Sequence, residues 1–473
     1  MCMTMTTPAR PPERALDHEH RSITLGLLAL VTMFAFEAVA VSLAMPSVAH
    51  ELNGETLYPV AVVGMLTAAI VGMVVGGIWS DARGPGRPIT YGGLGFVAGL
   101  LASGFAGTME VFVAGRLLQG LGCGLALTAM YVAVADAYPA HLRTRVFSLF
   151  ATAWVVPSIA GPFVAGALVD LFGWRSVFLV VAGFAALSTM VVRAAMGRRL
   201  LVRSAGMVWG RRPAYAVAAA LGVLALHLAG HGTGLRTALL LVGGLVVVVL
   251  SMGVLLPRGT ARGERGLPAV VAARGVFGGA FACVEMFLPL VLQDETGLSP
   301  TMTGLVMMVG ALGWTAGSAY SGKHGRPETF DGLLRAGAVT LLGGAAIIMA
   351  LVPIDHLPVA AAAVATIGFT VMAVGMGLAT PLMSTLALDL SPAGRQGESG
   401  AAIQMSDALG QSIAAGLVGA VFARWFLLDE QTSYFAGFGL AVLLAARALG
   451  LTRRCMTPQQ GGRATNKVVE QRI

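Results

Sequence analysis

Long apolar runs alternate with short polar stretches along almost the whole 473-residue chain. Each run approaches or exceeds the roughly 20 residues that an α-helix needs to cross a bilayer. The pattern predicts an all-α membrane protein with fourteen transmembrane helices. The expected ranges are 22–45, 58–80, 89–107, 111–138, 145–170, 176–196, 213–229, 237–256, 269–292, 301–321, 332–352, 358–388, 397–422 and 434–451.

Composition supports this interpretation. The chain is 56% hydrophobic and 11% charged, whereas soluble domains contain about 25% charged residues. The net charge of +8 does not indicate a nucleic-acid partner, because the basic residues form no dense cluster. The four cysteines lack the spacing of a disulfide framework or a metal site, so we expect no metal and no cofactor.

Basic residues predict the orientation in the membrane. With the N-terminus inside, nearly all of the 31 Lys and Arg residues fall on the inner side. The exceptions are Arg175, Arg236 and Arg424 in outer loops, and Arg116 and Arg274 inside helices. Such a bias places both termini in the cytoplasm.

The helix ranges divide the chain into two six-helix bundles joined by a linker with two additional helices. The expected segments are a cytoplasmic tail 1–21, a bundle 22–196, the linker 197–268, a bundle 269–451 and a tail 452–473. The first linker run is the weaker of the two, and a re-entrant or surface hairpin there would leave twelve spans.

Two stretches suggest an internal repeat. GGIWSDARGPGRP (Gly76–Pro88) and AGSAYSGKHGRP (Ala316–Pro327) each place a glycine, a small polar or acidic residue, a basic residue and GRP at a helix end. A parallel repeat of six-helix halves fits this, and such a repeat places the substrate site near the midplane between the halves.

The stretch WVVPSIAGPFVAGALVD combines prolines with small residues at a spacing of four. They are Pro157, Gly161, Pro162, Ala165 and Gly166. Each proline removes a backbone donor and should bend the helix, while a stripe of small residues lets another helix approach closely. The pattern therefore predicts a packing seam between two moving halves.

This stretch resembles the antiporter motif GxxxGPxxGG on the fifth helix of the major facilitator superfamily, with Pro157 and Ala165 in place of two glycines. The first repeat stretch resembles the loop motif GxxxDRxGRR of the same family, with Ala82 and Pro85 where the family has arginines. The resemblance implies a latch that holds one state of a transporter, in which Asp136 would take the part of the family's acid at the end of the fourth helix. The latch residues would be Gly77, Asp81, Arg83, Gly84, Arg87 and Asp136. Alternatively, Asp81 and Asp136 are only solvated side chains at the cytoplasmic ends of their helices and form no latch.

The segment GRLLQGLGCG resembles the family's RxxQGxG motif through Arg116, Gln119 and Gly120. An arginine inside an apolar helix costs about 2.5 to 3.5 kcal/mol on insertion scales, unless it faces a partner or water. The resemblance implies a position near the cavity and a role in proton coupling. Snorkelling to the outer interface is the alternative.

Glu37 lies mid-helix in FEAVAVSLAMP, nine residues before Pro46. The pattern resembles the helix-1 signature of the fourteen-helix drug:proton antiporter branch, where an aspartate precedes a proline by the same interval. We expect a lone carboxyl here to be neutral in low dielectric and to ionise when a cavity opens or a cationic substrate arrives. Competition between a proton and a cation would then couple the two flows, although a protonated glutamate that serves only packing is the alternative.

Two further acids are candidates for proton coupling or substrate binding. Glu285 lies in the middle of the range 269–292, the repeat counterpart of the first helix, and Asp407 lies about ten residues into the range 397–422. Either acid could instead belong to a structural pair.

An apolar cavity lined by soft and aromatic side chains would suit lipophilic substrates. Its expected lining is Phe34, Met130, Trp154, Phe287 and Trp314, although each of these residues could also face lipid or fill a packing gap. We therefore hypothesise a monomeric, proton-coupled exporter of lipophilic or cationic compounds in a bacterial inner membrane, working by alternating access.

An exporter of a lipid or a specific metabolite is the alternative, as is a membrane sensor that does not transport. An enzyme is disfavoured because no nucleophile–base pair or metal spacing lies at one membrane depth. An ATP-driven pump is disfavoured because the sequence contains no GxxxxGK[ST] loop.

Overall fold

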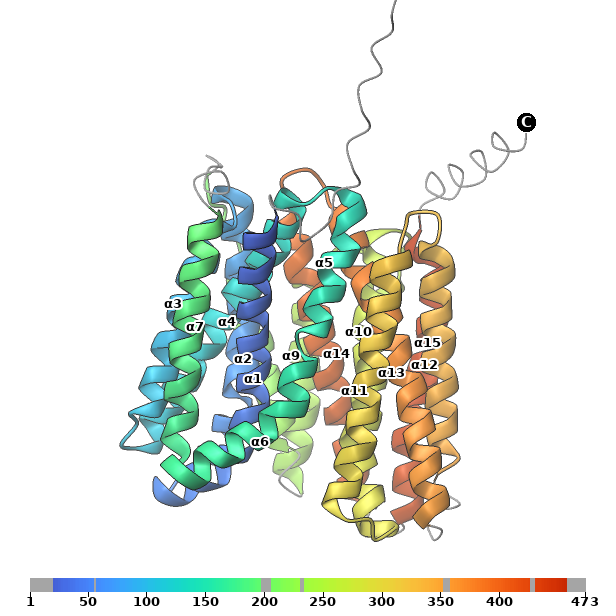
Figure 1. The fold of residues 1–473 in the computed structure, drawn as a ribbon. Coiled ribbons are helices and arrows are strands. Elements are labelled where there is room, and N and C mark those ends of the chain that lie inside the picture. The colour runs from blue at the N-terminus through green and yellow to red at the C-terminus, as the bar shows by residue number, and fades with distance from the viewer. Residues whose placement is uncertain are drawn as a thin grey trace, which may run out of the picture.

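The structure, a computed structural model, describes residues 20–54, 57–196, 206–229, 234–351, 358–425 and 430–456, and these form a bundle of helices (Figure 1). The predicted tails therefore lie largely outside the described residues. The helices are α1 (Arg21–Glu51), α2 (Tyr58–Arg83), α3 (Gly86–Gly104), α4 (Met109–Ala137), α5 (Ala140–Thr152), α6 (Val155–Phe172), α7 (Trp174–Met196), α8 (Arg212–Ala229), α9 (Leu235–Leu255), α10 (Leu267–Leu290), α11 (Pro300–His324), α12 (Phe330–Met349), α13 (Pro358–Asp389), α14 (Gln396–Trp425) and α15 (Glu430–Cys455).

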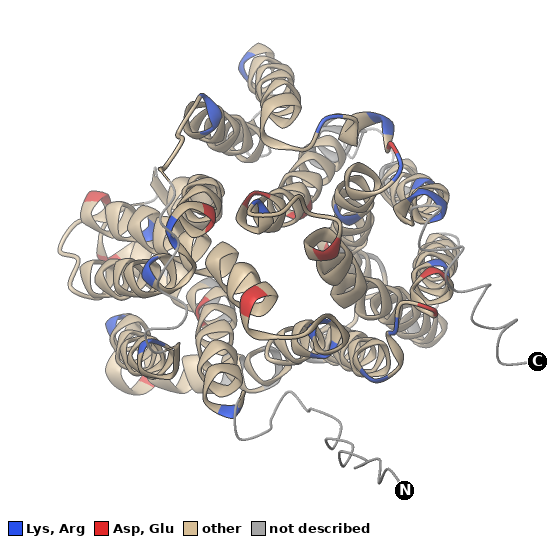
Figure 2. Cartoon of the chain, turned by 90° about the horizontal axis from the view of Figure 1, so that it is seen from above, with Lys and Arg blue, Asp and Glu red and all other residues tan. Residues whose placement is uncertain are grey.

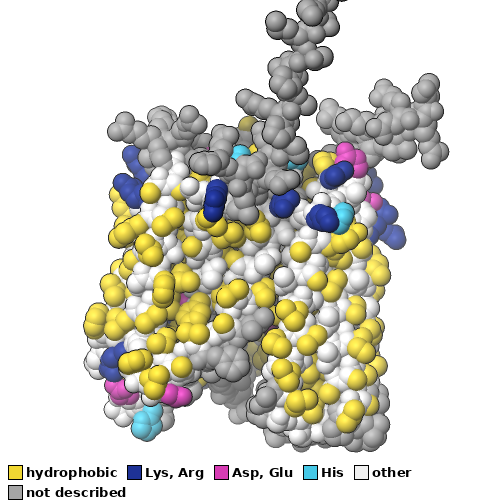
Figure 3. Space-filling model, in the orientation of Figure 1, with side chains coloured by type: hydrophobic (Ala, Val, Ile, Leu, Met, Phe, Trp, Pro, Cys, Tyr) yellow, Lys and Arg dark blue, Asp and Glu magenta, His cyan; other side chains and the backbone are white. Residues whose placement is uncertain are grey.

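Eleven of the described helices are long and apolar enough to cross a membrane. They include α8 and α9, whereas α3, the α5–α6 pair and α14 fall outside that set. Apolar side chains cover the middle of the surface, and charged side chains gather toward its two ends (Figure 3). An all-α membrane protein is confirmed, while fourteen crossings and cytoplasmic termini stay predictions.

The same five helix pairings occur twice. In the N half (α1–α7), α2 packs on α4, α3 on α4 and α7, and α1 on α6 and α7. In the C half (α10–α15), α11 packs on α13, α12 on α13 and α15, and α10 on α14 and α15. Each pairing of the first set has its counterpart in the second, as expected for a parallel repeat.

The two halves meet along a seam at the end of the bundle where α1 begins and α15 ends, which is the end seen from above in Figure 2. Helices α2, α4 and α5 of the N half contact α11, α13 and α14 of the C half there. The additional helix α8 packs against α9, α2 and α14, and α9 also packs against α14. Their apolar cluster joins residues of both halves, including Ile70 of α2, Val223 of α8, Val248 of α9 and Met405 of α14.

The predicted bend in the fifth helix is present. The helix begins at Ala140 rather than near Arg145, and it is interrupted between α5 and α6, at Ala153 and Trp154. Pro157 explains the position, because it offers no N–H to the carbonyl of Ala153, four residues earlier. As a result, α5 packs on the C half while α6 turns back to α1 and α7.

Glycines bring α4 and α2 into close backbone contact. A Cβ atom at Gly120 would lie 2.1 Å from the carbonyl oxygen of Met65, while one at Gly183 would meet nothing within 4 Å. We expect Gly120→Ala to lower the free energy of unfolding in detergent by about 1 to 3 kcal/mol, the usual cost of overpacking. Gly183→Ala is the matched control, and equal denaturant midpoints for the two variants would contradict the prediction.

Candidate functional site

Glu37 lies inside the N half and is 1% exposed. Its Oε1 accepts a hydrogen bond and forms an ion pair with Nη1 of Arg116, which reaches it from α4. The expectation of a lone carboxyl is therefore wrong, because the sequence could not show that these two residues face each other. Glu37 does not face lipid, and the Arg116 side chain does not extend to the outer interface, since this residue is only 4% exposed.

A network of neutral groups surrounds this pair. Nη1 of Arg116 also donates to Oε1 of Gln119 at 2.7 Å, and its Nε donates to the carbonyl of Ala61 at 3.2 Å. The amide of Gln119 donates in turn to the Ser103 hydroxyl at 2.9 Å. Gln119 of the RxxQGxG motif thus orients the arginine, while Oε2 of Glu37 has no hydrogen-bond partner in the described part of the chain.

Protonation of Glu37 would remove one charge of the pair and leave Arg116 without its counter-ion. Because a buried, uncompensated charge costs several kcal/mol, the protonated state favours any conformation that gives Arg116 another partner or water. The geometry can therefore couple a proton to a change of packing between α1 and α4.

A second, partly buried ion pair joins α10 to α14. Nη2 of Arg274 donates to Oδ2 of Asp407 at 2.7 Å, and the two side chains are 12% and 18% exposed. Arg274 also interacts electrostatically with Tyr131 of the N half. The structure thus pairs Asp407 with a cation. This agrees with the alternative interpretation, in which Asp407 belongs to a structural ion pair.

We expect Asp407→Asn to lower the free energy of unfolding by about 3 kcal/mol, because it leaves Arg274 buried without a counter-ion. The double variant Arg274→Gln/Asp407→Asn removes both charges and should recover most of that loss. Denaturant titration of the purified protein in detergent measures both values. A double variant that is less stable than the single one would contradict the prediction.

Glu285 differs from these two acids because its side chain is exposed, although most of α10 is buried. Its neighbours Val284 and Phe287 are 0% and 2% exposed. Glu285 therefore shares the exposed surface of α10 at this level with Met286, which is 46% exposed.

Asp81 lies in the seam. Its two carboxylate oxygens accept hydrogen bonds from the backbone N–H groups of Gly397 and Glu398, at 2.6 and 2.8 Å. These donors belong to the first turn of α14, where the helix dipole favours a negative charge. Gly77 permits this approach, because a Cβ there would lie 2.6 Å from the carbonyl oxygen of Gly397.

The other predicted latch residues lie near this contact, at the same end of the bundle. Gly84 ends α2 with a positive φ of 81°. Arg83, Arg87 and Asp136 are exposed at the same end of the bundle.

Sequence reasoning missed two ion pairs that connect separate parts of the chain at the seam. Arg143 of α5 donates to Asp389 of α13 at 2.5 Å, and Arg212 of α8 lies 2.6 Å from the carboxylate of Glu398 on α14. Both acids lie at helix ends, where the sequence alone indicates only solvated charges. Their partners are distant in sequence, so no local signal could have found them.

The predicted hinge residues lie along α6. Pro157, Gly161 and Ala165 are buried, whereas a Cβ at Gly166 would meet nothing within 4 Å. Gly166 therefore does not provide a close helix contact in this conformation. The side chain of Pro162 lies outside the described residues.

The predicted cavity lining separates into two groups. Phe34, Met130 and Phe287 are at most 3% exposed and belong to the apolar cores of the two halves, so they line no open surface in this conformation. Phe34, for example, packs edge-on against Phe96 at 4.8 Å between ring centroids. Trp154 is 45% exposed and Trp314 is partly exposed.

Comparisons with known proteins agree with this architecture. The sequence pattern of the family described as Major Facilitator Superfamily matches residues 25–415. The chain is 26% identical over 432 residues to a probable multidrug-efflux transporter of Mycobacterium tuberculosis (strain CDC 1551 / Oshkosh), which covers 89% of this chain and 91% of that protein.

A probable actinorhodin transporter of Streptomyces coelicolor is 29% identical over 463 residues, or 90% of this chain and 76% of that protein. Among solved structures, the human organic anion transporter MFSD10 has a similar fold, with a TM-score of 0.65 and 14% identity. The match covers 90% of this chain and 98% of that chain.

Proposed function

The chain belongs to the major facilitator superfamily, whose members are transporters, and from that premise we propose that it exports lipophilic or cationic compounds in exchange for protons. The membrane would be the inner membrane of a bacterial cell, with both termini in the cytoplasm. The buried pair of Glu37 and Arg116 carries the proposal, because it offers a carboxyl that can hold either a proton or an ion pair.

The two six-helix halves would be the bodies that move. The seam closes the end that carries the termini, and Asp81 and Asp389 each connect the N half to the C half there. This arrangement fits a conformation that is closed toward the cytoplasm. The bend between α5 and α6 would let the outer part of the fifth helix move with α1 while α5 keeps its contacts with α11 and α13.

In this cycle, Glu37 takes up a proton while the outer side is accessible, and the ion pair with Arg116 opens. Arg116 would then be held by Gln119 and the carbonyl of Ala61, which it already contacts. Return of the proton to the cytoplasm restores the pair. Arg274 and Asp407 hold α10 against α14, and Asp407 is a second candidate acid for the exchange.

The test is export from proteoliposomes with an imposed pH gradient, combined with measurement of proton release from the purified protein on addition of substrate. Ethidium and tetraphenylphosphonium serve as lipophilic probes. We expect the movement of the probe into or out of the proteoliposomes to depend on the pH gradient. We also expect the purified protein to release protons when the probe is added. Probe binding with no movement under any gradient would instead indicate a sensor.

A specific metabolite exporter is the second candidate function, and the similarity to the probable actinorhodin transporter favours it. The two functions differ in substrate range. Competition by several unrelated lipophilic compounds against one probe would support the broad exporter, whereas competition by a single chemical class would support the narrow one.

A further inference from the structure

The loop that joins α9 to α10, residues 257–266, is a structured turn that is attached to the end of α15. Gly263 and Gly266 adopt positive φ angles of 60° and 86°, a region that favours glycine. The N–H of Gly266 donates to the carbonyl of Arg454 at 2.9 Å, and Nη1 of Arg454 donates to the carbonyl of Arg262 at 3.2 Å. One backbone and one side-chain hydrogen bond therefore hold the loop on the last turn of α15.

Two guanidinium groups converge on Gly263. A Cβ atom at this glycine would lie 2.2 Å from a methyl carbon of Leu451 and 3.7 Å from Nη2 of Arg447, so the loop backbone rests directly on α15. Nη1 of Arg454 lies 3.4 Å from the carbonyl oxygen of Gly263. Arg447 and Arg454 thus place their charges beside the same residue of the loop.

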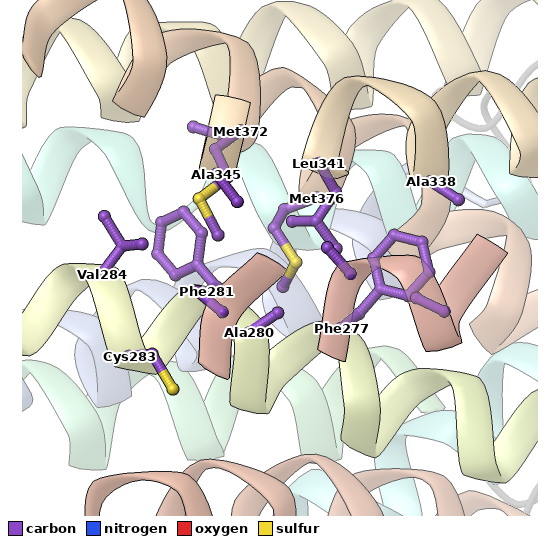
Figure 4. Packing of buried hydrophobic residues seen from close by; sticks show 14 of the residues in the cluster. Phe277, Ala280, Phe281, Cys283, Val284, Ala338, Leu341, Ala345, Met372 and Met376 are labelled. Atoms are coloured by element: carbon purple, nitrogen blue, oxygen red, sulfur yellow. The ribbon is translucent and has the colours of Figure 1, made fainter. Parts of the chain in front are cut away.

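Helix α15 leaves one face uncovered. Its other face is filled by the core of the C half, where Ala445 and Ala448 belong to the same apolar cluster as Phe277 of α10 and Leu341 of α12, part of which is seen in Figure 4. The exposed residues recur at helical spacing and form one stripe that runs to the end of the helix: Leu443, Arg447, Gly450 and Arg454. Leu443 is 69% exposed. The stripe is therefore apolar toward the middle of α15 and cationic at its end.

The cations of this corner lack carboxylate partners. The loop and the end of α15 carry six exposed arginines, namely Arg258, Arg262, Arg265, Arg447, Arg453 and Arg454. In the described part of the chain, none of them forms an ion pair. Glu264, the single acid of the loop, folds against Gly259, and Asp331 at the start of α12 is already paired with Arg335 at 2.8 Å. Clustered arginines at a membrane surface attract anionic headgroups, and the planar guanidinium group matches the geometry of a phosphate.

We propose that the loop 257–266 and the end of α15 form a binding site for the headgroup of an anionic phospholipid of the bilayer. Its phosphate would lie among Arg262, Arg447 and Arg454, and an acyl chain would follow the exposed stripe of α15 past Leu443. A bilayer lipid fits better than a free anion, because the apolar part of the stripe adjoins the cationic part. The site requires nothing of the proposed export function.

The experiment is a lipid titration of the purified full-length protein in detergent, followed by native mass spectrometry. The probes are dioleoyl phosphatidylglycerol, which is anionic, and dioleoyl phosphatidylcholine, which has no net charge. We expect the anionic lipid to bind about tenfold more tightly. Arg262→Gln/Arg447→Gln should weaken its binding about 25-fold, because each arginine near a membrane surface contributes about fivefold. The same variant should leave the binding of phosphatidylcholine unchanged.

Arg447→Lys keeps the charge but loses the planar donor pair, so it should weaken binding less than Arg447→Gln does. Lys323→Gln/Arg326→Gln is the matched control, because it removes two exposed charges at the end of α11 and should leave phosphatidylglycerol binding unchanged. Thermal unfolding of each variant shows that it is folded.

An equal loss of phosphatidylglycerol binding in the control variant would overturn the proposal, as would unchanged binding in Arg262→Gln/Arg447→Gln. Displacement of the lipid by equimolar glycerol 3-phosphate would overturn it as well, because the ligand would then be a free anion and not a lipid of the bilayer. None of these measurements involves transport, so a failure of the proposed function would leave their outcome unchanged.

Discussion

Proton-driven export should be lost when Glu37 is replaced by glutamine. Glutamine keeps the size of the side chain and can still accept a hydrogen bond from Arg116, but it cannot exchange a proton. We expect export under a pH gradient to fall at least a hundredfold and substrate-induced proton release to disappear. Glu37→Asp retains an ionisable group and should retain part of the export.

A loss of export could also follow from poor folding, because Glu37→Gln leaves Arg116 buried without a counter-ion, at a cost of about 3 kcal/mol. The double variant Glu37→Gln/Arg116→Gln removes both charges and should recover much of the stability. It should still fail to export. If this double variant is stable and exports in response to the pH gradient, the proposed role of the pair is wrong.

Asp81→Asn should open the seam. The substitution removes the negative charge and one acceptor from two backbone hydrogen bonds to α14, which we value at about 2 kcal/mol in total. A change of that size shifts a conformational equilibrium about 30-fold. We expect the population that is open at the terminus-bearing end to rise by that factor.

The population of the open conformation can be measured by maleimide labelling. The rate at which a maleimide labels Ser384→Cys is determined in a protein without its native cysteines. Ser384 is 2% exposed and lies opposite Tyr131 in the seam, so labelling requires opening. Asp331→Asn is the control, because Asp331 pairs with Arg335 within its own helix at 2.8 Å. Equal labelling rates in the two variants would contradict the role of Asp81.

The hydrophobic pattern predicted the helices well. Most observed helix ends lie within a few residues of the predicted ones, because the length of an apolar run determines the length of a membrane helix. Pro157 even located the interruption between α5 and α6. Helix length and the position of a proline-induced interruption are local properties, so they depend on the nearby sequence more than on tertiary contacts.

The direction in which a side chain faces could not be predicted in the same way. A membrane helix that is apolar all round has no polar stripe that marks its outer side. For that reason Phe34 and Met130 were expected at a cavity but are buried in the N half. The Glu37–Arg116 and Asp81–Gly397 contacts join residues 79 and 316 positions apart, and no sequence spacing specifies such a pairing.

The additional helices α8 and α9 have a mechanical consequence. α8 contacts both α2 and α14, and α9 contacts α8 and α14, so the pair links the two halves on one flank, while in the described part of the chain α6 contacts α11 directly on the other flank. Rotation of one half against the other should then pivot about the bridged flank. In the proposed transport cycle, a compound dissolved in the lipid would then enter laterally between α6 and α11, on the flank that the two additional helices do not bridge.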